Sequence, residues 1–380
     1  MTILELAMYN ADFLGSFGES ILALGKELRP KNIRMIVVLP ELKDWCQLFK
    51  EEGFIVEIIP MGYPIGVKGI LKLLNLVNKY QVKVIHTHFG IEYSLAAAMV
   101  HLISLLHPNL VWHWRGGPAR PNLVKRVAGS VMYKFLDTLV SVHIPNSDLI
   151  KEQLLQYKIV TPSKVAVIYN GINPDRFKPQ EGLSIRNELG IGSNELIIGN
   201  IRNFRSRVNH KLIMDTAKLV ISGNKNVRFI LVGDGPTRAE MEKYANTIGI
   251  GEKIIFTGIV QEVEKVYAVC NLTIVSYEPW CGESICNAVY ESLCMEKIVV
   301  IPNIGSTPYV FKEKDGVFIV PLNPEAMAEK VIELLNMDLH SLNAYGKRGR
   351  QKVLEQFTTE KWAKRIANIY AKTLLSKSLV

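Results

Sequence analysis

Two glutamates stand at the ends of the segment Glu283-Ser-Ile-Cys-Asn-Ala-Val-Tyr-Glu291. The segment lies between apolar runs at 272–277 and 298–301, and its pattern predicts a helix over 284–295. Glu283 would lie at the N-terminus of that helix, and Glu291, two turns further on, would approach the same crevice above a sheet. Carboxylates in such a crevice would accept hydrogen bonds from the hydroxyls of a sugar and of a ribose.

Glycine-containing turns follow two of the predicted strands. The turn Gly15-Ser-Phe-Gly18 leads into a helix expected to begin near Glu19, so its amides could face a phosphate, although a plain tight turn explains it equally well. The turn Gly233-Asp-Gly-Pro236 contains GxG, but Pro236 and Arg238 interrupt the GxGxxG pattern. The sequence therefore gives little support to nicotinamide dinucleotide binding.

Composition sets the outer limits of the interpretation. A chain of 380 residues exceeds what one hydrophobic core usually serves, so two domains are expected. The five cysteines are unclustered and the N-terminus lacks the order of a signal peptide, which together predict a cytoplasmic protein. The longest apolar candidate, Leu95 to Leu106, is interrupted by His101 and is too short to span a membrane.

Strand-like and helix-like segments alternate along the whole chain, as in parallel α/β sheets. The turn-rich segment 170–182 separates two series of strands. We expect a first domain over 1–179, a second over 180–358, and a terminal helix in 359–380 that packs back on the first. The predicted strands are 3–8, 33–39, 55–60, 82–86, 110–114, 139–144 and 165–169 in the first series, and 196–201, 227–232, 253–256, 272–276, 298–301 and 317–320 in the second.

A net charge of +9 points to an anionic partner, and a basic, aromatic segment at 112–135 offers a place for it. Such a mixture suits an anionic lipid surface, and a solvated helix that turns its apolar side to the core explains it equally well. We expect no nucleic acid partner. The residues concerned are Trp112, Trp114, Arg115, Arg120, Lys125, Arg126, Val131, Met132, Lys134 and Phe135.

The order of several motifs resembles glycosyltransferase family 4, a group of GT-B nucleotide-sugar transferases, over nearly the whole chain. Each motif alone is weak, but all of them in family order are specific. The motifs are Gly15 to Gly18, VIHTHFG at 84–90, VAVIYNGINPDRF at 165–177, IIGNIRN at 197–203, FILVGDGP at 229–236, IIFTG at 254–258, and the glutamate pair.

The resemblance implies two doubly wound Rossmann-like domains that face each other across a cleft, and transfer of a sugar, with retention, from a nucleotide-diphosphate donor, such as a UDP-sugar. It implies that Arg202 stabilises the leaving diphosphate, that Glu283 lies beside the donor sugar, and that Glu291 accepts from the ribose. Asn287 lies between the two glutamates and could donate to the diphosphate. Further donor-binding residues expected on this basis are Gly15, Gly18, Lys211, Gly233 and Gly258.

Two positions depart from the family pattern. Val208 stands where the family usually has a lysine, and we expect Arg207 to substitute for it. Arg115 stands where the family has a histidine before a glycine, on the acceptor side. Arginine can only donate, so a base there would have to be His88 or His113.

The basic, aromatic first domain, together with the family resemblance, favours a saccharide or lipid-linked acceptor at the inner face of the membrane, in cell-surface polysaccharide biosynthesis. The family is thought to use a front-face mechanism, which we favour because no acidic residue of the first domain matches a nucleophile. No DxD follows a strand, so we expect neither a metal nor another cofactor, with cations near Arg202 at the diphosphate. A GT-B-like epimerase, a phosphorylase and a catalytically degenerate sugar-nucleotide binding protein remain alternatives.

Overall fold

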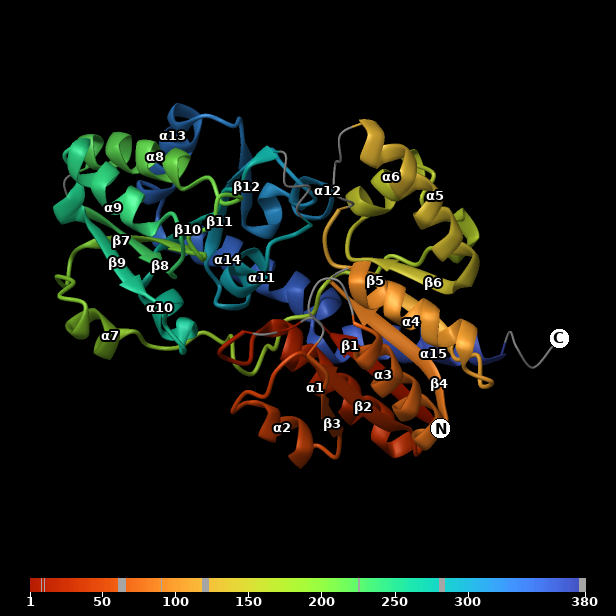
Figure 1. Ribbon diagram of the computed structural model, residues 1–380. Coiled ribbons are helices and arrows are strands. Elements are labelled where there is room, and N and C mark those ends of the chain that lie inside the picture. The colour runs from red at the N-terminus through yellow and green to blue at the C-terminus, as the bar shows by residue number, and fades with distance from the viewer. Residues whose placement is uncertain are drawn as a thin grey trace. The chain divides into compact units, whose positions relative to one another are not determined.

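The structure, a computed structural model, describes residues 1–7, 9, 11–60, 66–89, 91–117, 123–224, 226–279 and 284–375, with the backbone alone for 123–130 and 183. The chain folds into two compact units, one formed by 1–171 with 359–380 and the other by 172–358 (Figure 1). The first unit ends at Gly171 and not at 179, because the Ile172 amide already donates to the Phe357 carbonyl of the second unit.

The sheet of the first unit contains six parallel strands among the described residues, in the order β3-β2-β1-β4-β5-β6. Most of these strands are apolar on both faces, as parallel strands covered by helices must be. The strand order reverses between β1 and β4, the point at which open α/β sheets bind ligands. The strands are β1 (Thr2–Ala7), β2 (Arg34–Leu39), β3 (Ile55–Ile58), β4 (Val82–His88), β5 (Asn109–Trp114) and β6 (Val140–Pro145).

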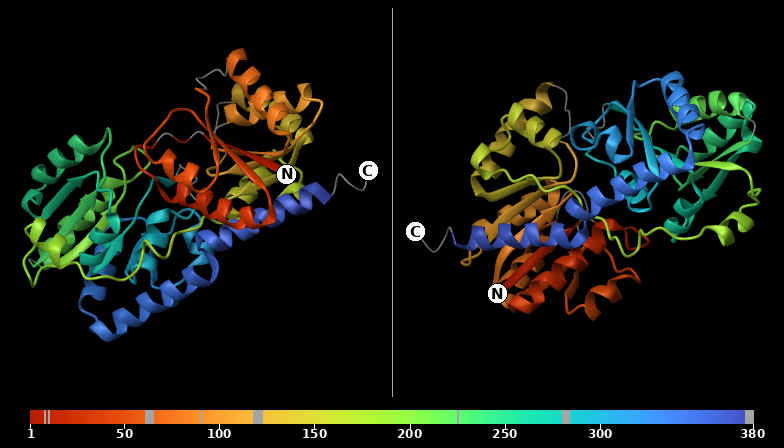
Figure 2. Two further views of the ribbon diagram at one scale, coloured as in Figure 1. Left: turned by 90° about the horizontal axis from the view of Figure 1, so that it is seen from below. Right: turned by 180° about the vertical axis from the view of Figure 1, so that it is seen from behind.

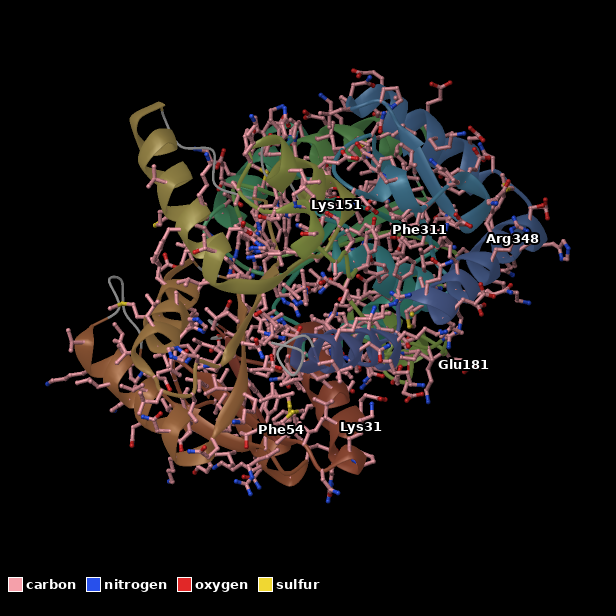
Figure 3. All side chains as sticks on the ribbon, turned by 90° about the vertical axis from the view of Figure 1, so that its right-hand side faces the viewer. Lys31, Phe54, Lys151, Glu181, Phe311 and Arg348 are labelled. Carbon is pink, nitrogen blue, oxygen red and sulfur yellow. The ribbon has the colours of Figure 1, made fainter. Side chains whose placement is uncertain are left out.

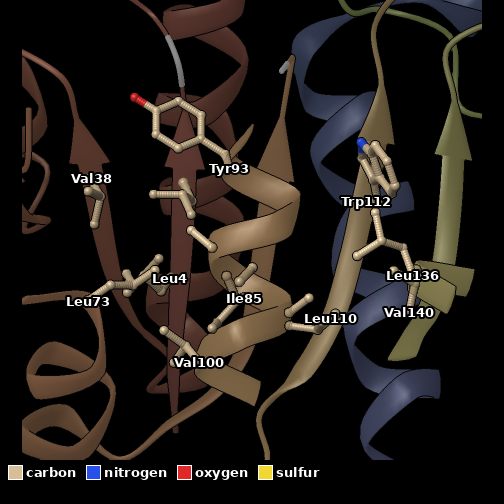
Figure 4. Packing of buried hydrophobic residues seen from close by; sticks show 14 of the residues in the cluster. Leu4, Val38, Leu73, Ile85, Tyr93, Val100, Leu110, Trp112, Leu136 and Val140 are labelled. Atoms are coloured by element: carbon tan, nitrogen blue, oxygen red, sulfur yellow. The ribbon is translucent and has the colours of Figure 1, made fainter. Parts of the chain in front are cut away.

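Helices cover both faces of this sheet. One face packs against α3 (Val67–Tyr80), α4 (Ile91–Ile103), α5 (Leu123–Leu139) and α6 (Asp148–Gln156) through the apolar cluster drawn in Figure 4. The other face packs against α1 (Ser16–Leu28), α2 (Cys46–Glu51) and α15 (Thr359–Leu375). Figure 2 shows α15 running alongside this unit, where it contacts α1. Two short 3-10 helices, η1 (Arg29–Lys31) and η2 (Pro162–Lys164), complete the unit.

The second unit repeats this architecture. Its described strands are all parallel, in the order β12-β11-β10-β7-β8-β9, and the order reverses between β10 and β7. The strands are β7 (Leu196–Ile201), β8 (Val227–Val232), β9 (Ile254–Gly258), β10 (Leu272–Ile274), β11 (Ile298–Pro302) and β12 (Val317–Val320).

The helices of the second unit also lie on both faces of its sheet. One face packs against α8 (His210–Gly223), α9 (Arg238–Thr247) and α13 (Pro324–Leu335), and the other receives α10 (Val263–Val269). Phe311, labelled in Figure 3, packs against Tyr290 and Phe357 and so joins three segments of this unit. The remaining elements are α7 (Leu183–Glu188), η3 (Gly251–Lys253), α11 (Asn287–Cys294), α12 (Thr307–Val310), η5 (Glu313–Asp315) and α14 (Leu339–Gln356).

Two sequence-based expectations differ from the structure. The segment 165–169 is not a full strand. It joins β6 through a single bridge between His143 and Val165 and through a hydrogen bond from the Ile168 amide to the Pro145 carbonyl, and Pro145 has no amide with which to continue the ladder. The helix expected over 284–295 is shorter and begins at Asn287, with Cys286 as its N-cap. None of the helices among the described residues combines the length and apolar character needed to cross a bilayer.

Candidate active site

Arg202 lies at the point where the strand order of the second unit reverses. It directly follows β7, and its amide donates to the Val232 carbonyl at 2.9 Å. Its guanidinium donates to the sulfur of Cys286, the N-cap residue of α11. The structure therefore brings Arg202 to the N-terminus of α11, where a cation, backbone amides and the positive end of the helix dipole together favour an anion.

The helix α11 carries Asn287 and Glu291 one turn apart, so both side chains lie on one side of the helix. Glu291 is partly buried, and its Oε2 accepts a hydrogen bond from the hydroxyl of Tyr267 at 2.8 Å. Tyr267 is fully buried on α10, and this burial, together with the Glu291 carboxylate, raises the pKa of the phenol well above its usual value. Tyr267 is therefore a permanent donor that holds one oxygen of Glu291.

Gly233 lets the loops after β7 and β8 approach each other closely. Its φ is +128°, and a Cβ there would lie 2.5 Å from the carbonyl oxygen of Arg202. Its amide donates to the carbonyl of Gly258 at 2.8 Å, which ties the end of β8 to the end of β9. Gly233 therefore shapes the backbone beside Arg202, and only glycine fits this position without strain.

The structure describes Val208, which stands where the family usually has a lysine, and the neighbouring basic residues Arg207 and Lys211. Val208 is 6% exposed, so its side chain faces the interior, whereas Arg207 is exposed and its carbonyl accepts from the Glu278 amide at 2.8 Å. Lys211 is exposed, pairs with Asp215 at 2.7 Å and donates to Tyr244 at 3.1 Å. Glu283 lies outside the described residues, together with 280–282.

In the first unit, Gly15 and Gly18 lie at the start of α1. Gly15 is the N-cap of this helix, and its amide donates to the Tyr9 hydroxyl at 3.0 Å. Gly18 is buried, and a Cβ there would lie 2.2 Å from Leu14. The two glycines thus allow Tyr9 and Leu14 to pack against the first turn of α1.

The predicted acceptor-side histidines belong to a buried polar cluster. His86, His88 and His113 are completely buried on neighbouring strands β4 and β5, and burial lowers the pKa of His88 and His113 well below the usual value. His88 Nε2 lies 2.7 Å from Glu5, a buried carboxylate in the middle of β1. His113 makes no hydrogen bond through its ring among the described residues, and it lies flat against Trp362.

Arg115 connects this cluster to the carboxyl end of β5. Its Nε donates to Nδ1 of His88 at 3.3 Å, and one terminal nitrogen donates to Asn170 at 3.2 Å. The guanidinium stacks over the ring of Phe17 at 4.6 Å. The residue that replaces the usual histidine is thus fixed in a defined orientation.

The sequence interpretation missed Glu5 and Tyr370. The Tyr370 hydroxyl donates to Glu5 Oε1 at 2.5 Å and lies 2.6 Å from Nδ1 of His86. A single carboxylate within the apolar strand TILELA was the available signal for Glu5, because an unpaired charge is rarely buried. Tyr370 gave no such signal.

Among the described residues, these three imidazoles are the group that could hold a metal ion. One ring nitrogen from each lies within 4.8 Å of the others. Neutral imidazoles are common metal ligands, and a carboxylate that accepts from two of them is a common outer partner. This group lies in the first unit, whereas Arg202 and α11 lie in the second.

Comparison with known proteins identifies the class of protein. The model described as "Glycosyl transferases group 1" matches residues 183–352, and the model described as "Glycosyltransferase Family 4" matches residues 18–176. The fold agrees with a Rickettsia africae glycosyltransferase, with a TM-score of 0.82, 19% identity and 98% of both chains covered. Anabaena HepE in complex with UDP also has a TM-score of 0.82, with 18% identity, covering 98% of this chain and 100% of HepE. The chain is a GT-B glycosyltransferase that belongs to glycosyltransferase family 4.

Two relatives indicate the range of activities within this class. N-acetyl-alpha-D-glucosaminyl L-malate synthase of Bacillus anthracis is 23% identical over 79% of this chain and 77% of its own length. UDP-Gal:alpha-D-GlcNAc-diphosphoundecaprenol alpha-1,3-galactosyltransferase of Escherichia coli is 22% identical over 82% of this chain and 80% of its own length. The chain is therefore an enzyme of the hexosyltransferase type.

The expectation for a membrane surface at 112–135 needs a correction. Trp112 and Trp114 are 2% and 6% exposed and stack on each other inside the first unit, so they do not reach a bilayer. They are buried because β5 is an inner strand of the sheet, covered by helices on both faces. Val131, Lys134 and Phe135 of α5 are exposed, and the side chains of Arg120, Lys125 and Arg126 lie outside the described residues.

Proposed function

We propose that this enzyme transfers a sugar, with retention of configuration, from a UDP-sugar to a saccharide or lipid-linked acceptor in cell-surface polysaccharide biosynthesis. The observation that carries the proposal is the convergence of Arg202 with the N-terminus of α11, which also bears Asn287 and Glu291. UDP as the nucleotide is supported by two similar proteins, the E. coli galactosyltransferase that uses UDP-Gal and HepE, which forms complexes with UDP and UDP-glucose.

The roles of the residues follow from charge. During transfer, the bond from the anomeric carbon to the β-phosphate oxygen breaks and its electron pair stays on the diphosphate, so negative charge grows there. Arg202 and the amides at the start of α11 stabilise that charge without a metal ion. Glu291 accepts from the ribose and Asn287 donates to the diphosphate, whereas Lys211 and Arg207 supply further positive charge. In the front-face route, the leaving phosphate takes the proton of the acceptor hydroxyl as the new bond to the anomeric carbon forms.

The donor is identified by a thermal-shift panel of UDP, GDP and ADP with their sugars. A ligand that binds the folded enzyme raises the melting temperature by mass action, so UDP and one UDP-sugar should raise it most. Arg202→Ala should reduce that shift, because the variant loses the cation at the diphosphate. An equal shift with all three nucleotides, or none with UDP, would contradict the assignment. Release of UDP from the donor with no acceptor present would favour the epimerase alternative, and release that requires inorganic phosphate would favour the phosphorylase.

The first unit is proposed to meet the cytoplasmic face of an anionic membrane through α4 and α5, which contact each other. Exposed Met99, Leu102 and Ile103 of α4 and exposed Val131 and Phe135 of α5 form this apolar surface. Basic Lys134, with Arg120, Lys125 and Arg126 of the same segment, adds the charge that attracts anionic lipid.

Sedimentation with vesicles tests this surface. Binding to phosphatidylglycerol vesicles should be strong at low salt, weaken as salt screens the charges, and be lost when Arg120, Lys125 and Arg126 are changed to Glu. A Val131→Ser, Phe135→Ser double variant should bind less at every salt concentration. Equal binding by the parent and the charge-reversed variant would refute the contact and favour a soluble acceptor.

A further inference from the structure

Glu5 is a charged group in the centre of the first unit. It is 0% exposed, and an isolated charge at such a place would be unfavourable by many kcal/mol unless it were paired. Burial by itself would raise the pKa of Glu5, but His86 and His88 outweigh that effect and hold the pKa well below its usual value. The Tyr370 hydroxyl and His88 Nε2 lie 2.5 and 2.7 Å from its two oxygens, so Glu5 has the two hydrogen-bond donors that a buried carboxylate anion needs.

This charge fixes the proton on His88. An ionised carboxylate can only accept, so the 2.7 Å contact requires that His88 Nε2 carry the proton. Nδ1 of the same neutral ring then has a lone pair, which accepts from Arg115 Nε at 3.3 Å. One imidazole in one tautomer thus connects the buried anion Glu5 to the cation Arg115.

The guanidinium of Arg115 is held from several sides. Asn170 accepts from one terminal nitrogen, and the rings of Phe17, Phe89 and Trp362 lie 4.6, 5.7 and 5.6 Å from its central carbon. The other terminal nitrogen, Nη2, has no hydrogen-bond partner among the described residues. A donor so fixed, at the carboxyl end of β5, is suited to bind a substrate oxygen.

Two of these supporting residues come from the last helix of the chain. Tyr370 of α15 donates to Glu5 across 365 positions of sequence, and it also accepts from the Nδ1 proton of His86. Trp362, one face of which lies against His113, comes from the start of the same helix. The return of α15 to the first unit therefore completes the cluster around Arg115.

We propose that Tyr370 is a positioning residue of this transferase, because it anchors Glu5, which sets the tautomer of His88 and thereby orients Arg115 toward a substrate oxygen. The proposal rests on the proposed transferase function. A divalent cation among the three imidazoles is the competing interpretation of the cluster. It would add two positive charges beside the Arg115 guanidinium against the single negative charge of Glu5, and for that reason we favour the metal-free arrangement.

The arrangement can be tested without any substrate. In protein labelled with ¹⁵N at histidine, the ring of His88 should show the neutral tautomer protonated at Nε2, and Glu5→Leu should convert that signal to the other tautomer or a mixture. Thr373→Val is the matched control, because it removes a buried hydroxyl of α15 that donates to the Ile369 carbonyl. A His88 signal unchanged in Glu5→Leu, or stoichiometric Zn²⁺ binding that shifts His86, His88 and His113 together, would overturn the proposal.

The kinetic test is a double-mutant cycle. Tyr370→Phe keeps the ring but lacks the hydroxyl, and it should lower kcat by about tenfold with little change in the KM for the donor. In an Arg115→Ala background the same change should lower kcat no further, because its effect passes through Arg115. A purely structural role would reduce kcat by the same factor in both backgrounds, and that outcome, or an unchanged kcat in Tyr370→Phe, would refute the proposal.

These two tests separate this proposal from the proposed function. Thr373→Val should leave kcat unchanged in both backgrounds, and the melting temperature of each variant shows whether it is folded. If the parent enzyme transfers sugar from no donor while His88 has the expected tautomer, the transferase assignment fails and the Glu5–His88–Arg115 arrangement is confirmed. If transfer is normal in Tyr370→Phe, only the positioning role fails.

Discussion

Replacement of Glu291 separates its two contacts, one to the protein and one to the proposed nucleotide. Glu291→Gln keeps an oxygen that can accept from Tyr267, which lies 2.8 Å away, but it removes the negative charge. The hydrogen bond to a charged acceptor is worth about 1.5–3 kcal/mol and a neutral one about 1 kcal/mol, so UDP binding should weaken by about 0.5–2 kcal/mol, or roughly 2–30-fold in Kd.

The companion substitution Tyr267→Phe acts on the protein contact. Tyr267 is 0% exposed and donates to a carboxylate, so removal of its hydroxyl should lower the free energy of unfolding by about 1–3 kcal/mol. Isothermal titration calorimetry with UDP and urea denaturation measure the two effects. Glu262→Gln is the matched control for the first substitution, because this glutamate of the same unit is 62% exposed and pairs only at the surface with Lys265.

The reasoning fails if Glu291→Gln binds UDP as tightly as the parent while Tyr267→Phe destabilises the protein. Glu291 would then be a structural partner of Tyr267. It also fails if Glu262→Gln weakens UDP binding as much as Glu291→Gln does, because the effect would then come from overall charge and not from a contact.

Three further outcomes are expected. Arg202→Ala should lower kcat by roughly 100-fold or more in a transfer assay with the identified donor while circular dichroism stays unchanged, and a loss within a few-fold would remove this residue from the site. Gly233→Ala should lower the unfolding free energy by roughly 2 kcal/mol or more, because its Cβ would lie 2.5 Å from a carbonyl oxygen. The control Gly249→Ala, at a position with a positive φ but no atom within 4 Å of a Cβ, should lower it by only about 1 kcal/mol. Equal losses of unfolding free energy in the two variants would contradict the argument. Burial, with a smaller effect of the Arg202 cation, lowers the pKa of His210 from 6.5 to about 4, so stability should be full above pH 6.5 and fall by up to about 3 kcal/mol as the pH approaches 4. In urea titrations that fall should shrink in His210→Phe but not in the exposed control His340→Phe, and equal pH dependence in both variants would refute it.

Much of the fold could be predicted from local sequence. The strands at 196–201, 227–232 and 317–320 have the predicted bounds, because buried parallel strands are continuous runs of Ile, Val, Leu and Phe that end at turn residues. The position of Arg202 could also be predicted from the end of the strand at 196–201, because a residue directly after a parallel strand lies at the carboxyl edge of the sheet. The family was predicted from the order of its motifs, each of which is local.

Periodicity could not decide what a strand residue faces. In the sequence, Trp112 and Trp114 lie beside basic residues, and this pattern suggested membrane binding. Only the packing of helices on both faces of β5 shows that the two side chains belong to the core. The same limit applies to helix starts. The helix expected over 284–295 begins at Asn287, because the apolar pattern of the segment does not show where the backbone first turns helical.

The sequence by itself determined the alternation of strands and helices, the two domains and the class of enzyme, because these depend on apolar runs, turns and motifs that neighbouring residues define. Only the tertiary structure decided that Glu5, His88, Arg115 and Tyr370 form one hydrogen-bonded cluster. Tyr370 and Glu5 meet because α15 returns to the first unit. The return of a terminal helix to the first unit was expected, but which of its side chains meets Glu5 depends on how the whole helix packs, and no local pattern along the chain encodes that.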